Sequence, residues 1–206
     1  MGSSVSLLER IGHSALDFVF PPRCICGAVG TFLCEDCAAS LKPAMPPRCP
    51  NCWRPGFAQT CTLCLVSPPP FDGLRAGYVY EDVARALVQS LKYRGLTSLG
   101  APLGSLCVEA LRKTGLEFEV IVPVPLHGMR KRTRGYNQAE LLARHIGKAL
   151  GVPIEIRALE RQRRTPQQAR SVDAEQRKRN VAGAFRGRPE AFQGQAVLLV
   201  DDVTTT

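Results

Sequence analysis

The stretch AVLLVDDVTTT, residues 196–206, joins an apolar run to two adjacent carboxylates and three hydroxyl side chains. The apolar residues 196–200 predict a buried strand of the kind found in parallel sheets. Asp201 and Asp202 would place two like charges at the end of that strand, which is unfavourable unless a ligand or a cation compensates them. The stretch therefore predicts one half of a binding site at the carboxyl end of a strand.

The rest of the second half of the chain alternates between helix and strand patterns. Apolar residues at helical spacing predict three helices, over 82–95, 99–113 and 137–151, with Asp82 as an N-cap and Gly95 and Gly151 as stops. Apolar or alternating runs predict strands over 74–82, 118–126 and 152–156, and residues 171–180 form a polar helix pattern. This alternation indicates an α/β fold with a parallel sheet, whose ligands bind at the carboxyl ends of the strands.

A second strand end carries the opposite charge. The segment 127–138, HGMRKRTRGYNQ, follows the predicted strand 118–126 and leads into the predicted helix 137–151. A basic segment with a glycine turn at a helix N-terminus suits a phosphate or a pyrophosphate. The whole chain carries 27 Lys and Arg against 18 Asp and Glu, a formal charge of +9, which favours anionic partners.

One ligand satisfies all of these features. Adjacent carboxylates accept hydrogen bonds from the vicinal hydroxyls of a sugar, or meet a magnesium ion that a polyphosphate carries in. Threonine hydroxyls and backbone N–H groups cradle a phosphate, and the basic segment takes a pyrophosphate. The sequence therefore predicts a site for phosphoribosyl pyrophosphate (PRPP) together with Mg²⁺.

Eight of the nine cysteines lie between residues 24 and 64, in four close pairs. Close pairs of thiolates are typical ligands of structural zinc, and two pairs complete one tetrahedral site. Sequential pairing gives a first set of Cys24, Cys26, Cys34 and Cys37 and a second set of Cys49, Cys52, Cys61 and Cys64. The spacing also allows an interleaved pairing.

Other interpretations of the cysteines are weaker. A disulfide framework would require an oxidising compartment, and no export signal supports one. Cys107 stands apart on the apolar side of a predicted helix and is expected to be a buried free thiol. Trp53 and Arg54, beside the third pair, either stack on a nucleic-acid base or simply pack against the ribbon.

The domain organisation follows from these patterns. Residues 1–20 are expected to form an amphipathic helix, because apolar residues recur there at helical spacing. Glu9, Arg10 and Asp17 interrupt the apolar run, so it resembles neither an export signal nor a membrane span, and no transmembrane segment is expected. A proline-rich stretch, 66–73, separates a double zinc ribbon over 21–67 from an α/β domain over 71–206.

Three motifs carry a family resemblance that covers nearly the whole chain. VLLVDDVTTT (197–206) resembles the start of the PRPP-binding motif of type I phosphoribosyltransferases. PVPLHGMRKRTRGYNQAELLA (123–143) and RTPQQARSVDAEQRKRNVAGAF (164–185), behind a double zinc ribbon, resemble the ComF/GntX family. Cys24-Ile25-Cys26 departs from the family, which usually has C-x-x-C there. The family's phosphate loop continues beyond Thr206, so the chain is expected to be a C-terminally truncated fragment that binds the 5′-phosphate poorly.

The resemblance implies a Rossmann-like type I phosphoribosyltransferase domain and a role for each strand end. Asp201 and Asp202 would hold the ribose hydroxyls, and Thr204, Thr205 and Thr206 would begin the 5′-phosphate cradle. The pyrophosphate loop would comprise Arg130, Arg134, Gly135, Tyr136 and Asn137. Arg134 and Arg164 would act in catalysis, with Arg164 on a mobile lid over 160–171 that also carries Arg161 and Arg163. His127 is expected to be structural rather than a general base.

Two classes of function are compatible with these residues. The first is a PRPP-binding, transferase-like protein that acts in the cytoplasm in natural competence, DNA uptake or DNA utilisation, as the resemblance implies. Its zinc ribbons would contact single-stranded DNA or proteins of the uptake machinery. The alternative is an active phosphoribosyltransferase acting on a base or nucleotide acceptor unrelated to DNA uptake. The sequence shows no acceptor pocket with a general base, which favours the first class.

Overall fold

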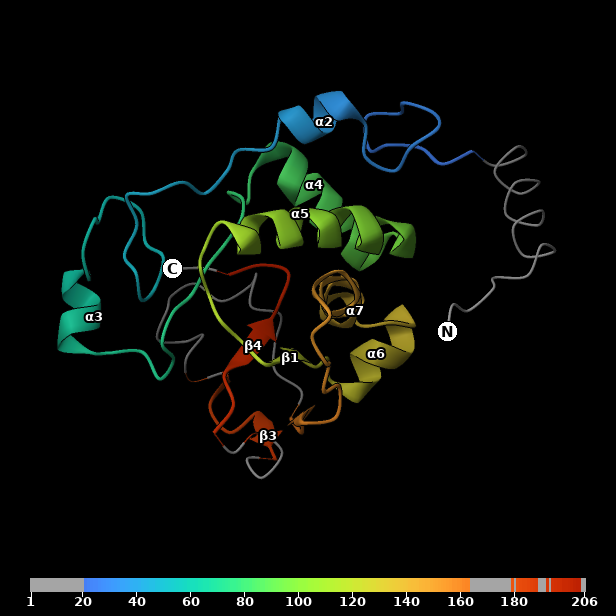
Figure 1. Ribbon diagram of the computed structural model, residues 1–206. Coiled ribbons are helices and arrows are strands. Elements are labelled where there is room, and N and C mark those ends of the chain that lie inside the picture. The colour runs from blue at the N-terminus through green and yellow to red at the C-terminus, as the bar shows by residue number, and fades with distance from the viewer. Residues whose placement is uncertain (1–20, 164–178, 180, 189–191, 193, 205–206) are drawn as a thin grey trace.

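The sheet is built around β1 (Val120–Pro123), which pairs in parallel with β4 (Val197–Val200) in the computed structural model (Figure 1). The structure describes residues 21–163, 179, 181–188, 192 and 194–204. On its other edge, Ile121 of β1 forms a parallel bridge with Ile154. The predicted parallel α/β arrangement is confirmed.

The two paired strands differ in burial. All four residues of β1 are buried, as its apolar sequence predicts. The prediction of a buried strand over 196–200 is wrong for one face of β4, where Val197 and Leu199 are 42% and 56% exposed. Side chains alternate along a strand, and within the described residues it is Leu198 and Val200 that pack into the core.

Two predicted helices pack above the sheet, α5 (Gly100–Arg112) and α7 (Gln138–Leu150) (Figure 1). Asn137 caps α7 by accepting the N–H of Ala139 at 3.2 Å, and Gly151 ends it with a left-handed φ of 71°. Apolar side chains from α5, α7 and both strands form one buried cluster: Val108, Ile121, Leu142, Ala143, Ile146 and Val200.

Helix α4 (Asp82–Tyr93) matches the helix predicted over 82–95 except at its start. Glu81 occupies the N-cap position in place of Asp82, and no side chain caps the helix. Instead, the carboxylates of Glu81 and Asp82 lie 3.1 and 3.4 Å from Nζ of Lys42 in the cysteine-rich half. Gly95 follows the last turn with a φ of 71°, so the predicted stop is confirmed, and the 3₁₀ turn η1 (Thr97–Leu99) leads into α5.

Other segments differ from their predicted conformation. Residues 152–156 contribute a single bridge rather than a strand, because Pro123 lacks the N–H that would continue the ladder toward Glu155. The basic segment forms a short helix, α6 (Gly128–Arg134), which Gly135 ends with a φ of 84°. The helix predicted over 1–20 falls on residues that the structure does not describe, as does nearly all of the one over 171–180.

An antiparallel pair joins β2 (Leu159–Arg161) to β3 (Phe185–Gly187), and the sequence does not predict it. The guanidinium of Arg161 lies 5.1 Å from the centre of the Phe185 ring across this pair. The pairing brings the two ends of the intervening segment, 162–184, side by side.

The cysteine-rich half contains an internal repeat that the predictions missed. Pro-Pro-Arg-Cys occurs at 21–24 and again at 46–49, and each copy leads through an antiparallel bridge to a short helix, α2 (Glu35–Ala39) or α3 (Thr62–Val66). In both copies the residue after the second cysteine has a positive φ, 97° for Gly27 and 62° for Trp53. Both residues also donate their N–H at 2.9 Å to the carbonyl of the first cysteine, across three residues in the first copy and four in the second, so the two turns are similar but the first is one residue shorter.

Backbone and side-chain contacts join the cysteine-rich half to the α/β half. Residues 42–44 pair with 77–79, through Ala44 N–H to Gly77 at 2.9 Å and Val79 N–H to Lys42 at 2.9 Å. The predicted strand over 74–82 is thus reduced to one bridge, between Tyr78 and Pro43. A second buried cluster spans both halves, with Leu41 packed beside Leu87, Leu91 and Leu99.

The close approach of α5 to α7 depends on Gly104. A Cβ atom there would lie 2.6 Å from Cβ of His145, a distance that requires the helices to move apart. We expect Gly104→Ala to lower the free energy of unfolding by about 1–3 kcal/mol, although alanine is the better helix former.

Urea denaturation of the two proteins measures this change. Gly187→Ala is the matched control, because a Cβ atom there meets open space, and it should be nearly neutral. An unchanged midpoint for Gly104→Ala would mean that the two helices do not approach as closely as described.

Candidate functional site

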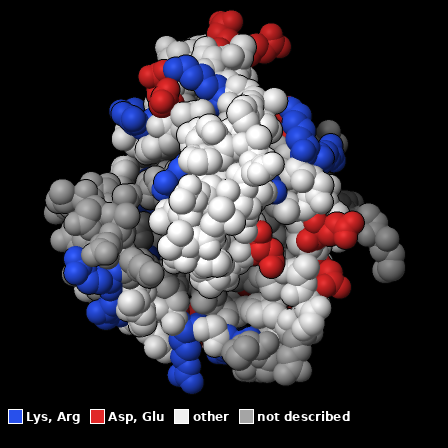
Figure 2. Space-filling view, turned by 90° about the vertical axis from the view of Figure 1, so that its left-hand side faces the viewer, with Lys and Arg blue, Asp and Glu red and all other residues white. Residues whose placement is uncertain are grey.

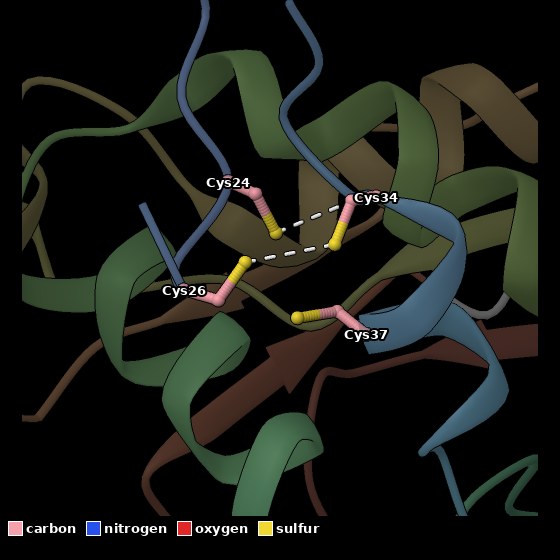
Figure 3. A group of neighbouring side chains, drawn as sticks. All are labelled: Cys24, Cys26, Cys34 and Cys37. Carbon is pink, nitrogen blue, oxygen red and sulfur yellow. Dashed lines mark hydrogen bonds between the residues drawn. The ribbon is translucent and has the colours of Figure 1, made fainter. Parts of the chain in front are cut away.

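The first four cysteines, Cys24, Cys26, Cys34 and Cys37, turn their sulfur atoms toward a common centre (Figure 3). The four Sγ atoms lie within 4.8 Å of one another, and those of Cys26 and Cys34 are 3.6 Å apart. Four sulfurs around a tetrahedral zinc ion, each about 2.3 Å from it, would be separated by about 3.8 Å. The donor set and its spacing therefore fit Zn²⁺.

The second group, Cys49, Cys52, Cys61 and Cys64, has the same geometry. Its sulfurs also lie within 4.8 Å of one another, with 3.7 Å between those of Cys52 and Cys61. The structure thus brings together the two sequential sets of cysteines rather than interleaved ones. Cys34 and Cys61 each occupy the N-cap position of a short helix, so the third ligand of each set is fixed by a helix start.

Backbone N–H groups stabilise one thiolate in each group. The N–H of Cys34 donates to Sγ of Cys24 at 3.4 Å, and that of Cys61 donates to Sγ of Cys49 at 3.3 Å. Burial acts to raise the pKa of Cys24 and Cys49, but these and neighbouring backbone donors outweigh it and lower the pKa of each to about 6. Zinc binds deprotonated cysteine, so these donors favour the metal-binding form of one ligand in each group.

The two groups have different surroundings. Ile25 and Leu33, which adjoin ligands of the first group, pack in the same cluster as Leu87 and Leu91 of α4. The helix of the second group, α3, instead exposes its apolar side chains Leu63, Leu65 and Val66. In Figure 2 the face that carries α3 is largely uncharged, with charged groups toward its edges. Neighbours of the first group therefore belong to the cluster around α4, although Cys26 itself is exposed, while the helix of the second group presents an apolar surface.

The carboxyl ends of β1 and β4 meet at one point of the sheet. The N–H of Val124 donates to the carbonyl of Val200 at 2.9 Å, and Nδ2 of Asn137 donates to the carbonyl of Val124 at 3.0 Å. Asp201 and Asp202 directly follow Val200, so the two carboxylates begin beside the segment that leads to α6 and α7. Thr204 is exposed nearby, whereas Thr205 and Thr206 are outside the described residues.

The side chain of Asp202 is buried, with 4% of its surface exposed. Its Oδ1 lies 2.8 Å from Nζ of Lys92, in the last turn of α4. Its Oδ2 is also buried and has no hydrogen-bond partner among the residues described. Lys92 is thus the cation that compensates this carboxylate.

Asp201, by contrast, keeps an exposed surface, and its Oδ1 accepts the N–H of Asp202 at 2.8 Å. Desolvation of its carboxyl group and the charge of Asp202 raise the pKa of Asp201 to about 6, although Lys92 acts in the opposite direction. A carboxylate in this position gains from hydrogen-bond donors or a cation that a ligand supplies.

The basic residues expected near pyrophosphate lie on α6. Nη1 of Arg134 donates to Oε1 of Gln138 at 2.5 Å, and its guanidinium lies 5.5 Å from the centre of the Tyr93 ring. Tyr136 donates its hydroxyl to the carbonyl of Leu91. Gly135, Tyr136 and Asn137 therefore shape the connection between α6 and α7, and α4 holds it in place.

Arg161 of β2 experiences the charges of both Arg130 on α6 and Asp201 at the end of β4. Burial lowers the pKa of Arg161, the charge of Arg130 lowers it further, and Asp201 raises it. These three groups thus share one electrostatic environment, although they come from α6, β2 and the end of β4. Of the other predicted lid residues, Arg163 donates to the carbonyl of Ala182 at 2.7 Å, and Arg164 is not among the residues described.

The contacts of three further residues are explained by the packing of the protein itself. His127 caps α6 by accepting the N–H of Met129 at Nδ1, 3.4 Å away, as a structural histidine would. Trp53 donates Nε1–H to the carbonyl of Ala76 at 3.1 Å, and the guanidinium of Arg75 lies 4.7 Å from its ring centre. Burial raises the pKa of Cys107 to about 11, as expected for an unreactive thiol.

Lys92 and Tyr93 contact Asp202 and Arg134 of the candidate site, but no sequence pattern selects them. A basic residue in the last turn of a helix is explained well enough by the helix dipole. Their roles depend on the position of α4 beside the strand ends, which only the folded chain reveals.

These features define a class: a pair of Cys₄ groups suited to zinc, joined to a Rossmann-like α/β domain with acidic and basic strand ends. The chain matches no protein-family model. It is 34% identical over 181 residues to the DNA utilization protein YhgH of Salmonella typhimurium, an alignment that covers 84% of this chain and 78% of the relative.

Two further relatives come from other bacteria. Competence protein F of Haemophilus influenzae is 31% identical over 183 residues, which cover 84% of this chain and 79% of the relative. Competence protein ComFC of Bacillus subtilis is 26% identical over 182 residues, with coverage of 84% and 72%. This chain belongs to the ComF/GntX family, which the motifs had indicated. Within the described part of the chain, no helix is both long and apolar enough to cross a bilayer.

Metal analysis should give two zinc ions per purified chain, one for each group of thiolates. Cys34→Ser and Cys61→Ser, at equivalent positions of the two repeats, should each reduce the content to about one. Cys34→Ser should lower the melting temperature more than Cys61→Ser, because the first group packs against α4.

The pair of substitutions provides its own control, since both remove the same ligand atom. Protein that contains no zinc and has its cysteines oxidised would contradict the metal assignment. Equal losses of melting temperature would contradict the different roles of the two groups.

Proposed function

We propose that this protein binds PRPP with Mg²⁺ at the carboxyl ends of β1 and β4, and that it acts in DNA uptake or DNA utilisation. The hydrogen bond between Val124 and Val200 carries the proposal, because it sets two carboxylates beside a basic segment. Few metabolites combine vicinal hydroxyls with phosphate groups on both sides, and PRPP does so.

The acidic side suits the ribose and its 5′-phosphate. Asp201 and Asp202 would accept hydrogen bonds from the two ring hydroxyls, each charge-assisted bond contributing about 1.5–3 kcal/mol. Thr204, followed by Thr205 and Thr206, would begin the cradle for the 5′-phosphate with hydroxyl and backbone donors.

The basic side suits the pyrophosphate. Arg130 and Arg134 on α6 would contact it, and Gly135, Tyr136 and Asn137 would hold the backbone that leads to the N-terminus of α7. Mg²⁺ bound with PRPP would neutralise part of the pyrophosphate charge. Arg134, together with Arg164 from the segment between β2 and β3, would stabilise the pyrophosphate as it departs.

The names of the relatives support the cellular role. One is called a DNA utilization protein and two are called competence proteins. The two zinc-binding groups would then contact single-stranded DNA or partner proteins of the uptake machinery. Clusters of free thiolates persist in a reducing compartment, which fits a cytoplasmic site of action.

A second candidate is an active phosphoribosyltransferase whose acceptor is a base or a nucleotide unrelated to DNA uptake. The position of β2 favours it, because Arg161 of β2 experiences the charge of Asp201 at the end of β4. A lid that includes residues of this segment, as the family resemblance implies, would exclude water while ribose is transferred.

Titration with PRPP and Mg²⁺ tests the first proposal. We expect the chain to bind PRPP when Mg²⁺ is present. Asp201→Asn with Asp202→Asn should weaken this binding at least about 100-fold, since two charge-assisted acceptors are lost. Arg134→Ala should weaken PRPP but spare ribose 5-phosphate, which has no pyrophosphate.

Matched controls are available on the surface of α5. Glu109→Gln and Arg112→Ala change the same kinds of charge and should leave PRPP affinity unaltered. Parent-like affinity in both site variants would refute the assignment. Release of pyrophosphate with an added acceptor would support the transferase, and binding without turnover across bases, nucleotides and DNA ends would support the binding protein.

Binding to single-stranded DNA should depend on salt, because phosphate contacts release counterions with a slope of about −0.7 per phosphate. We expect the basic groups of α6 and β3 to supply these contacts, so Arg132→Ala with Arg186→Ala should reduce the slope by about 1.4. Arg112→Ala with Lys113→Ala is the control.

Trp53→Ala tests the ribbon separately. A stacked base is worth about 1–3 kcal/mol and does not alter the salt slope, so a loss of affinity at constant slope would implicate the ribbon. Affinity that does not change with salt would contradict the contacts proposed for α6 and β3.

A further inference from the structure

The contact between Lys92 and Asp202 joins the end of α4 to the end of β4. Its distance is 2.8 Å, and the two side chains are 20% and 4% exposed. Other ion pairs of the described residues, such as Lys113 with Glu109 and Lys131 with Glu140, have at least one partner more than half exposed. A charge pair that is mostly buried fixes its members far more strictly than one at the surface.

The surroundings of Asp202 make it dependent on Lys92. Its Oδ1 is held by the lysine, and no described residue donates to its buried Oδ2. Its neighbour Asp201 adds a second negative charge, which acts on Arg161 of β2. Without Lys92, the buried carboxylate of Asp202 would have no cation beside it among the residues described.

Helix α4 is itself braced on its other sides. Leu87 and Leu91 are fully buried in the cluster that includes Ile25 and Leu33 of the first cysteine group. The carbonyl of Leu91 also accepts the hydroxyl of Tyr136, from the connection between α6 and α7. Lys92 thus projects from a rigid support toward the strand end.

We propose that Lys92 is a positioning residue for the strand-end carboxylates. It holds the carboxylate of Asp202 in place, so that the adjacent and exposed Asp201 is oriented toward the ligand. Asp201 then contacts the ligand from an exposed position, whereas Asp202 both faces the ligand and anchors the strand end to α4. This inference rests on the proposed PRPP site for its ligand, but the ion pair itself can be tested without PRPP.

A double-mutant cycle on the full chain tests the proposal. We expect Lys92→Met to weaken PRPP binding about tenfold or more, while Lys92→Met with Asp202→Asn binds no worse than Asp202→Asn alone. Lys92→Arg should restore part of the affinity, because it keeps a cation at the same place. Lys113→Met, which removes an exposed lysine with a carboxylate partner, should have no effect.

Additive losses in the cycle would overturn the proposal, since Lys92 would then act on the ligand directly or on the fold in general. Parent-like binding by Lys92→Met would overturn it as well. A further prediction concerns the acids: Asp201→Asn should weaken PRPP even with Asp202→Asn and Lys92→Met present, because its contact is separate.

A parent chain that does not bind PRPP would refute the proposed function, and the ion pair is then judged by urea unfolding. The same cycle of Lys92→Met and Asp202→Asn should be non-additive in the denaturation midpoint, with Lys92→Met the more harmful single change. Additive midpoints would show that Lys92 does not hold Asp202, whatever the ligand.

Discussion

The parallel pairing of β1 with β4 is the constraint on which the rest of the structure depends. Parallel strands end at the same edge of a sheet, so whatever follows each strand is brought to one place. Here the pairing continues to Val124 and Val200, the last residues before the charged segments. The basic segment after β1 and the two carboxylates after β4 are about 75 residues apart in the chain, and this pairing brings them to the same edge of the sheet.

Helix α4 connects this site to the cysteine-rich half. One side of the helix buries Leu87 and Leu91 against the first Cys₄ group, and its last turn supplies Lys92 and Tyr93 to the strand ends. A Cys₄ group replaces a hydrophobic core that so short a segment cannot build alone. In this protein the first group does more, since its shell also supports the helix from which the site is completed.

The two cysteine groups show how one construction serves two settings. Both begin with Pro-Pro-Arg-Cys and both end on a helix of five residues. The first group places Ile25 between its first two ligands, and that side chain packs toward α4. The second has Trp53 after its second ligand, and its helix leaves Leu65 and Val66 exposed. The difference lies in the residues between the ligands rather than in the ligands.

The sequence by itself determined those features that arise from local pattern. Apolar periodicity and helix stops located α4, α5 and α7, cysteine spacing identified the eight candidate ligands, and the acidic and basic strand ends marked the candidate site, whereas the structure decided which cysteines share a group. Tertiary structure alone decided the exposed face of β4, the pairing of β2 with β3, and the partnership of Lys92 with Asp202. Each of these depends on which distant segment packs alongside, and residue spacing carries no information about that.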